Sequence, residues 1–268
     1  MFGRIGVVAL ALMLGGCADG DDDSDAALPV EPGATSSGKA ASDSSFDKDA
    51  ARALAKSALF VIGDFPAGWG ATPADPDTED GEELQKQLSE CLDAPSNLFG
   101  EGADGVSEDS SDFNSPDEAT TVSSSVSVAA PGRMRQFFDV MKGENVSGCL
   151  SEAMNAAVQA ELKKSKDETT KDMTFEKPKV GQLSFPTLGD ETVPLRVSMT
   201  ASYAAFSFDF YLDLIYIRSG DNGVSVTFEG TDRPVSIETE QQYAEIAAER
   251  LAGLPGSTPS TASAAPSP

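Results

Sequence analysis

The sequence predicts an α+β protein with a single domain, in which helices flank an antiparallel sheet between a disordered N-terminal tether and a disordered C-terminal tail. Three observations predict it. Segments with the apolar spacing of helices stand both before and after the strand candidates. The two clearest strands, Ser202–Arg218 and Val224–Phe228, are joined by a turn too short for a parallel crossover. The stretch between the low-complexity ends, residues 48–253, is long enough for one domain with its own core.

The helices are predicted from apolar residues that recur at intervals of three and four. The last one is expected to begin at Thr239, with Gln242 completing a capping box, and to stop at Gly253, shortly before Pro255. The segments with this spacing are Ala50–Ala58, Leu84–Leu92, Met134–Met141, Leu150–Leu162 and Tyr243–Leu251.

The strands are predicted mostly in the second half, from β-branched residues and alternating polarity: Thr121–Val128, Phe175–Phe185, Val193–Met199, Ser202–Arg218 and Val224–Phe228. In Ser202–Arg218 the residues Phe206, Phe208, Phe210, Leu212 and Leu214 share one face, opposite Ser207, Asp209, Tyr211 and Asp213. Residues 219–223 form a turn, with Asn-Gly as the favoured hairpin pair. We expect helices to cover the apolar face, whereas the other face can meet water. Ala74–Glu83 and Gly100–Glu118 are expected to be acidic loops.

The N-terminus has the pattern of an export signal. Arg4 precedes an apolar run, Ile5–Leu14, which is shorter than a membrane span, and an acidic stretch follows it. The residues Leu-Gly-Gly-Cys that end at Cys17 resemble the lipobox of bacterial lipoproteins. The resemblance implies that residues 1–16 are removed, that Cys17 is acylated, and that residues 17–47 tether the domain to the extracytoplasmic face of the cell membrane. Residues 254–268 are expected to form the disordered tail.

The cysteine count gives a second expectation. The chain has 3 cysteines, so that acylation of Cys17 leaves Cys91 and Cys149. In an oxidising compartment these two are expected to form a structural disulfide, because the spacing of a redox pair is absent.

The charge excludes several classes of function. The net charge of −25 repels phosphate backbones, so we expect no nucleic-acid partner. The chain has no histidine, which removes histidine-based acid–base catalysis and histidine-ligated metals. We expect no catalytic residues, no metal and no cofactor. The single tryptophan, Trp69, is interpreted as a core residue, with stacking on a ligand as the alternative.

The order of the segments resembles the PknH-like extracellular sensor domain of actinobacterial receptor kinases and lipoproteins. The resemblance lies in Asp64–Trp69, in Val126–Val128 with Gly148–Leu150, and in a third stretch that runs from Leu188–Glu191 through Ile217–Asp221 to the closing helix. It implies an antiparallel sheet flanked by helices and a ligand groove, and it brings no catalytic residues. The kinase members carry more cysteines than the one pair left here.

These observations predict a non-enzymatic lipoprotein that binds or senses an apolar or amphipathic ligand, such as a lipid, or an envelope protein. One alternative is a carboxylate-dependent envelope hydrolase; another is a scaffold or assembly factor for a membrane complex. Asp209 and Asp213 do not suit the hydrolase, because four residues along a strand separate them by roughly 13 Å.

Overall fold

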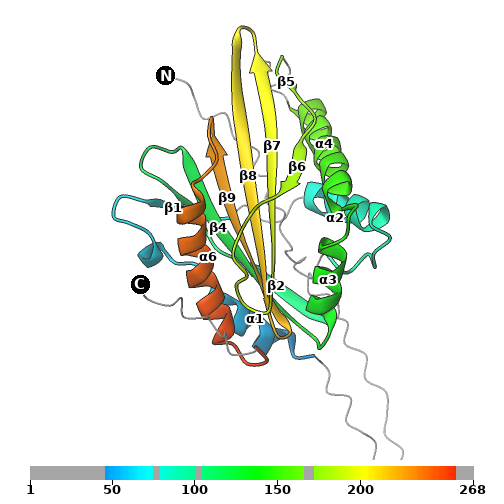
Figure 1. Ribbon diagram of the computed structural model, residues 1–268, viewed down its shortest axis with the longest axis vertical. Helices are drawn as coiled ribbons and strands as arrows, with labels where there is room; N and C mark the ends of the chain where they lie inside the picture. Colours follow the sequence, from blue (N-terminus) through cyan, green and yellow to red (C-terminus); the bar gives the residue numbers. More distant parts are fainter. Residues whose placement is uncertain (1–45, 75–78, 100–103, 166–171, 258–268) are drawn as a thin grey trace, which may run out of the picture.

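A computed structural model of the chain describes residues 46–74, 79–99, 104–165 and 172–257 (Figure 1). The predicted signal peptide, Cys17 and most of the tether and tail lie outside the described residues. The helices are α1 (Lys48–Ala58), α2 (Glu79–Cys91), α3 (Arg133–Met141), α4 (Val146–Lys164) and α6 (Ile237–Ala252), with a short 3₁₀ turn, η1 (Ile62–Asp64). The strands are β1 (Gly70–Thr72), β2 (Gly105–Asp109), β3 (Asp112–Asn114), β4 (Thr120–Ala129), β5 (Thr174–Phe175), β6 (Lys179–Gln182), β7 (Glu191–Tyr203), β8 (Phe206–Ser219) and β9 (Asn222–Thr231).

The predicted fold class is confirmed, because the described strands form one sheet in which every pairing is antiparallel. The strand order is β1-β3-β4-β9-β8-β7-β5, with β2 also paired to β4 and β6 also paired to β7. Long strands joined by tight turns form the centre of the sheet, and short strands lie at its two edges (Figure 1).

Both faces of the sheet carry a hydrophobic core, so helices also cover the face that the sequence allowed to meet water. Alternate residues of β8 are buried on opposite sides: Ile215 and Ile217 pack with α1 and α6, whereas Leu214 and Tyr216 pack with α2, α3 and α4. Figure 1 shows these two helix groups on either side of the sheet. We call them the α1/α6 core and the disulfide core. The second core exists because α2, α3 and α4 bring their own apolar stripes to the sheet.

The predicted strand Ser202–Arg218 is divided by a turn that the sequence analysis missed. The chain reverses at Ala204 and Ala205, so that Tyr203 ends β7 and pairs with Phe206 at the start of β8. The turn carries none of the usual glycine, proline or asparagine, and Ala204 adopts a φ of 53°. The predicted apolar face of β8 is therefore not buried along its whole length. Leu214 is buried, whereas Phe206, beside the turn, is 71% exposed.

The turn between β8 and β9 is also shifted from its predicted position. Ser219 pairs with Asn222, so that the loop is Gly220-Asp221 and the Asn-Gly pair belongs to β9. Gly220 supplies the φ of 62° that the turn needs. The amide of Asn222 is used elsewhere, since it donates to the Pro255 carbonyl at 3.0 Å.

The two predicted acidic loops contain regular structure. Helix α2 begins at Glu79, inside the first. Strands β2 and β3 lie inside the second, where Val106 and Phe113 are buried in the α1/α6 core. Single buried apolar residues among acidic ones gave too weak a periodic signal to predict these strands.

The domain ends also differ from their predicted places by a few residues. Helix α6 begins after Ser236, whose hydroxyl accepts from the Thr239 amide, so Thr239 is not the cap. The predicted stop at Gly253 is confirmed. Leu254, assigned to the tail, is buried in the α1/α6 core, and Asp47, assigned to the tether, caps α1.

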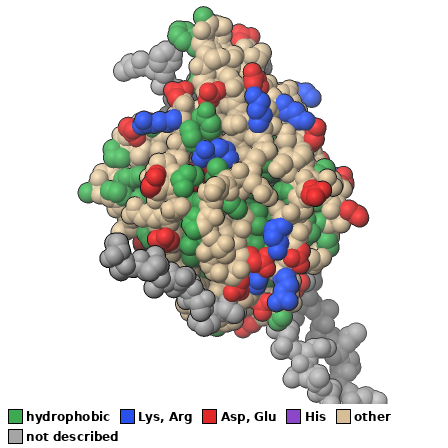
Figure 2. All heavy atoms as spheres, in the orientation of Figure 1, with side chains coloured by type: hydrophobic (Ala, Val, Ile, Leu, Met, Phe, Trp, Pro, Cys, Tyr) green, Lys and Arg blue, Asp and Glu red, His purple; other side chains and the backbone are tan. Residues whose placement is uncertain are grey.

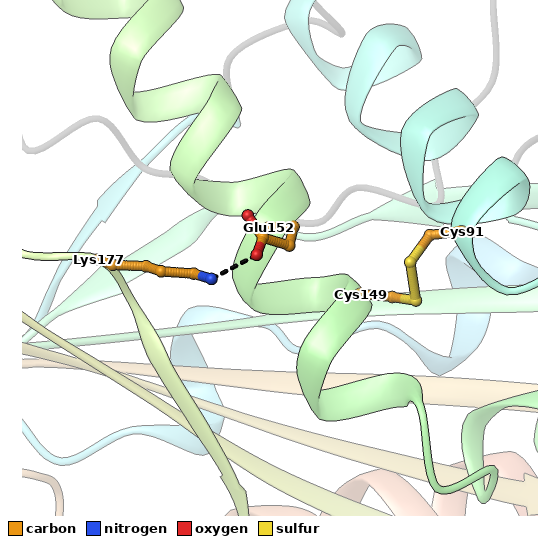
Figure 3. The surroundings of a disulfide bond; sticks show 4 residues. All are labelled: Cys91, Cys149, Glu152 and Lys177. Carbon is orange, nitrogen blue, oxygen red and sulfur yellow. Dashed lines mark hydrogen bonds and ion pairs between the residues drawn. A yellow bond between two sulfur atoms is a disulfide. The ribbon is translucent and has the colours of Figure 1, made fainter.

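The predicted disulfide is confirmed. Cys91 at the end of α2 and Cys149 in the first turn of α4 are joined, with their Cα atoms 5.6 Å apart (Figure 3). Nearby, Lys177 points toward α4 and forms an ion pair with Glu152 (Figure 3). The bond fixes α2 on α4 and thereby holds the helical layer over β6, β7 and β8.

Candidate functional site

On the side of the sheet that faces α2, α3 and α4, the side chains change from apolar to hydroxyl-bearing between β8 and β9. On β8 this face is apolar, but on the next strands the same face carries hydroxyl groups. Strand alternation places Ser225 and Thr227 there, because Val224, Val226 and Phe228 face the α1/α6 core. The register adds the serine partners on β4 and β2, and it places Asp109 of β2 beside them, opposite Ser125. We call this set the hydroxyl face: Ser107, Ser123, Ser125, Ser127, Ser225 and Thr227.

The hydroxyl face is hydrogen-bonded across its strands. The Ser107 hydroxyl lies 3.1 Å from that of Ser125 and 3.0 Å from that of Ser127. Ser125 and Ser225 pair directly across β4 and β9, and both are buried. Hydroxyls at such positions need polar neighbours, because an apolar environment would leave them unsatisfied.

Helices that contact β4 and β9 closely lie on the other side of the sheet. Among the described elements, α1 packs on β4 and α6 packs on β9, and both belong to the α1/α6 core. Helices α2, α3 and α4 instead cover the β6–β8 half, as Figure 1 shows. At the end of this face Met134 of α3 lies against Gly223 of β9, and Ser107, Ser125, Ser225 and Thr227 are buried. Its partly exposed members are Ser123 and Ser127, and the neighbouring Glu229 is also partly exposed.

Glu229 lies on the same side of β9, next to this face. It pairs with Thr121 on β4 and with Leu212 on β8, and it is half-buried. Burial raises the pKa of the Glu229 carboxyl to about 7, and the charge of Asp112 raises it further in the same direction. Near neutral pH this carboxyl is present in both states, so it can donate as well as accept.

Leu212 links the hydroxyl face to an apolar row along β8. Phe208, Phe210 and Leu212 share this side of the strand and are partly exposed, and the two phenylalanine rings meet edge to face at 5.5 Å. The combined surface is amphipathic, since hydroxyls and one neutralisable carboxyl adjoin aromatic and aliphatic side chains. Such a surface suits a ligand with an apolar part and a hydrogen-bonding part.

A small polar pocket of about 180 Å³ lies near the β7–β8 hairpin. The Thr200 hydroxyl donates to the Asp209 carboxylate at 2.8 Å in its wall. Its lining residues are polar apart from one methionine: Glu176, Lys177, Lys179, Ser198, Met199, Thr200, Asp209 and Tyr211. The pocket is too small for a lipid chain and suits at most a small polar group.

A buried charge cluster follows the pocket along the same face of β7 and β8. Arg196 donates to both oxygens of Asp213, at 2.6 and 2.5 Å, and reaches Glu240 at 3.3 Å. Asp213 is 1% exposed and Glu240 is fully buried in the first turns of α6. Burial and the neighbouring Asp213 raise the pKa of Glu240 to about 9. Glu240 therefore stays protonated at neutral pH, and the cluster holds α6 to the sheet.

The structure does not bring Asp209 and Asp213 into a catalytic pair. Asp209 accepts from Thr200 at the pocket, while Asp213 is buried against Arg196, although its face was the one that could meet water. Trp69 stacks on Phe65 at 5.0 Å, as a core residue would. Cys17 lies outside the described residues.

The segments that carry the family resemblance contact one another in places. Arg218 binds Glu191 at 2.8 Å and Asp190 at 3.3 Å, which joins the two parts of the third stretch. Asp64 of the first stretch accepts from Arg250 on α6 at 2.5 Å. These contacts hold together segments that are distant in the chain.

Sequence reasoning missed Glu229, Glu240 and Arg196. A signal existed for Glu229, since it is a lone charge at the end of the strand Val224–Phe228. None existed for Glu240, because a glutamate in the first turn of a helix is ordinarily solvent-exposed.

The described residues contain no group of three or more histidine, cysteine, aspartate or glutamate side chains placed to hold a metal ion. Within the same part of the chain, no helix is both long enough and apolar enough to cross a membrane.

Comparison of the sequence with models of known protein families gives no match, and neither does comparison with curated proteins.

Proposed function

We propose that this chain is a non-enzymatic binding or sensing module, held at the extracytoplasmic face of the cell membrane by an acylated Cys17, with an amphipathic ligand on the hydroxyl face and the adjoining apolar row. The observation that carries the proposal is the side-by-side position of Glu229 and Leu212 on paired strands. It joins a hydroxyl-lined surface, where the Glu229 carboxyl has a pKa of about 7, to partly exposed aromatic side chains.

The chemistry of the surface favours a neutral polar part in the ligand. The hydroxyl face consists of serine and threonine with Asp109 paired beside Ser125, and its strands hold no lysine or arginine to attract a phosphate or carboxylate. The net charge of −25 disfavours an anion further. Hydroxyl and neutralisable carboxyl groups suit the hydroxyls of a glycan or polyol, which both donate and accept. A lipid with a sugar or glycerol headgroup has both the neutral hydrogen-bonding part and the apolar part that this surface requires.

The location rests on the Leu-Gly-Gly-Cys sequence, and the membership of the PknH-like sensor family is part of the same proposal. Labelling intact cells with a fatty-acid analogue tests the anchor: the wild-type chain is expected to take up the label and Cys17→Ala is not. Equal labelling of both chains contradicts the lipid anchor but has no bearing on the proposed ligand site.

The ligand surface is tested by purifying the full chain from cells in mild detergent and identifying bound molecules by mass spectrometry. Thr227→Val removes one hydroxyl from the face without changing its shape. We expect occupancy to fall at least about fivefold, the loss expected from one hydrogen bond. Thr200→Val, in the hairpin pocket on the opposite face, is the matched control and is expected to keep its ligand. A wild-type chain free of envelope molecules, or equal occupancy in Thr227→Val, contradicts the proposal.

A carboxylate-dependent hydrolase is the second candidate, and one observation favours it. Asp112 raises the pKa of Glu229, which places a second carboxylate near a carboxyl that can exchange a proton at neutral pH. Release of sugars from envelope glycans by the wild-type chain, abolished in Glu229→Gln, supports this reading. Activity that survives in Glu229→Gln excludes Glu229 as the acid.

A further inference from the structure

The tip of the β7–β8 hairpin, residues 201–208, projects beyond the rest of the sheet (Figure 1). Phe206 is 71% exposed and is the most exposed large hydrophobic side chain among the described residues. Figure 2 shows hydrophobic side chains at this end of the molecule. Residues 197–208 contain no charged side chain, in a chain of which 24% is charged.

The two faces of the tip differ. Tyr203 pairs with Phe206, and Phe208 follows on the same face, so aromatic rings line one side. On the other side, the hydroxyls of Ser202 and Ser207 lie 2.6 Å apart. An element with aromatic rings on one side and hydroxyls on the other suits the boundary between lipid and water, where tyrosine and phenylalanine keep their apolar bodies out of water.

The turn itself departs from ordinary hairpin chemistry. Ala204 has a φ of 53°, a conformation in which glycine or asparagine is favoured. At the opposite end of β8 the turn is Gly220-Asp221, and there a glycine adopts the φ of 62°. The projecting turn therefore has apolar residues, Ala204 and Ala205, although the backbone of Ala204 is strained. The turn at the other end of β8 is polar.

From these observations we infer that the hairpin tip is a second membrane contact, which inserts Phe206 and its neighbours into the lipid–water interface of an uncharged bilayer. The inference rests on the proposed lipid anchor for bringing the tip to a membrane. It adds a direct contact by the folded domain, which an anchor alone does not require. A single aromatic side chain binds a bilayer weakly, but a tether raises its effective concentration there.

The length of the chain before the domain permits this contact. Helix α1, where the described chain begins, lies at the end opposite the tip (Figure 1). The 14 residues of β8 span about 46 Å at strand rise. At full extension the 30 residues between Cys17 and α1 would span about 100 Å. This segment can therefore pass along the domain, so that Cys17 and the tip enter the same bilayer.

The experiment uses the full, acylated chain in phosphatidylcholine vesicles whose acyl chains carry bromine, which quenches tryptophan fluorescence on contact. Phe206→Trp places an indole at the tip. Ile62→Trp is the matched control, because Ile62 is 49% exposed but lies at η1, away from the hairpin. The tryptophan emission of the wild-type chain comes from Trp69 alone and is subtracted from that of each variant. We expect the emission added by Phe206→Trp to fall at least about twofold relative to unbrominated vesicles, and that added by Ile62→Trp to stay nearly constant.

The outcomes separate this inference from the anchor. If the chain sediments with vesicles but the indole at the tip is not quenched, the tip contact is overturned and the anchor stands. If the chain does not sediment, both are overturned. Anionic phosphatidylglycerol is expected to weaken the quenching at low salt, because the chain is strongly acidic. Stronger quenching would indicate attraction to charge in place of aromatic insertion, and would also overturn the inference.

Discussion

Asp213 and Glu240 share one guanidinium. Arg196 lies between them, with Nη2 at 2.5 Å from Asp213 Oδ2 and 3.3 Å from Glu240 Oε1, and both carboxyl groups are buried. One positive charge cannot neutralise two carboxylates, so one carboxyl retains its proton. Glu240 is that group, since its other oxygen has no hydrogen-bond partner in the described residues.

The stability of the protein should therefore fall as the pH rises. The unfolded chain releases the Glu240 proton near the ordinary pKa of 4.5, whereas the folded chain keeps it until about 9. Between these values the folded state binds more protons, so each rise in pH favours unfolding. Glu240→Gln retains the neutral form. It should be more stable than wild type at pH 8 by at least about 1 kcal/mol and equal to it near pH 4.

Denaturant unfolding at both pH values measures this effect. Glu238→Gln is the control, because Glu238 lies in the same helical turn but is exposed. It should leave the pH dependence unchanged. A Glu240→Gln chain that is less stable than wild type at pH 8 would show that the carboxylate form holds α6.

Glu229 should contribute a second pH dependence at lower pH. Its pKa of about 7 means that stability is lost as the pH rises from 4.5 to 7. Glu229→Gln should remove about 1 kcal/mol of this loss, an amount reduced by partial exposure. Unfolding free energies at pH 5 and 7.5 test it, with Glu108→Gln on the other face of the sheet as control. Parallel pH profiles for wild type and Glu229→Gln would contradict the raised pKa.

Removing the disulfide should destabilise the domain without changing its fold. Cys91 and Cys149 are 58 positions apart, and opening a loop of that size costs about 4 kcal/mol in the chain-entropy model. Cys91→Ser with Cys149→Ser should lower the unfolding free energy by roughly that amount. Reductant should destabilise wild type similarly and leave the double variant unaffected. A reductant effect on the double variant would place the sensitivity elsewhere.

Gly220 should resist substitution. A Cβ there would lie 1.9 Å from the carbonyl oxygen of Gly256, and the φ of 62° adds strain for any other residue. Gly220→Ala should destabilise by about 1–3 kcal/mol. Gly181→Ala is the control, since a Cβ at Gly181 meets no atom within 4 Å. Equal thermal midpoints for the two variants would show that the C-terminal segment moves aside freely.

Local signals predicted the helices well and the strands less completely. Met134, Phe137, Phe138 and Met141 stand at helical spacing and are all buried in α3, because a helix that packs on a sheet must carry such a stripe. The hairpin at Ala204 escaped prediction, because its turn contains no residue that signals a reversal. Strands β2 and β3 escaped because acidic residues surround their few apolar ones.

The candidate site was not predictable from the sequence. The segment Thr121–Val128 was predicted as a strand. Whether its serines form a hydroxyl cluster depends on the face that they occupy and on Ser225 and Thr227 opposite them. Those residues come from strands about 100 positions apart in the chain. Pairings of that range are set by the whole sheet and leave no local pattern.

By itself the sequence determined the fold class, the pairing of Cys91 with Cys149 and the stop of the last helix at Gly253, because each depends on periodicity, composition or a residue's own backbone preference. Only the tertiary structure decided that both faces of the sheet are covered, that Asp213 is buried and that Glu229 adjoins Leu212. The environment of a carboxyl group depends on the atoms around it, and those atoms arrive from distant segments only when the sheet is complete.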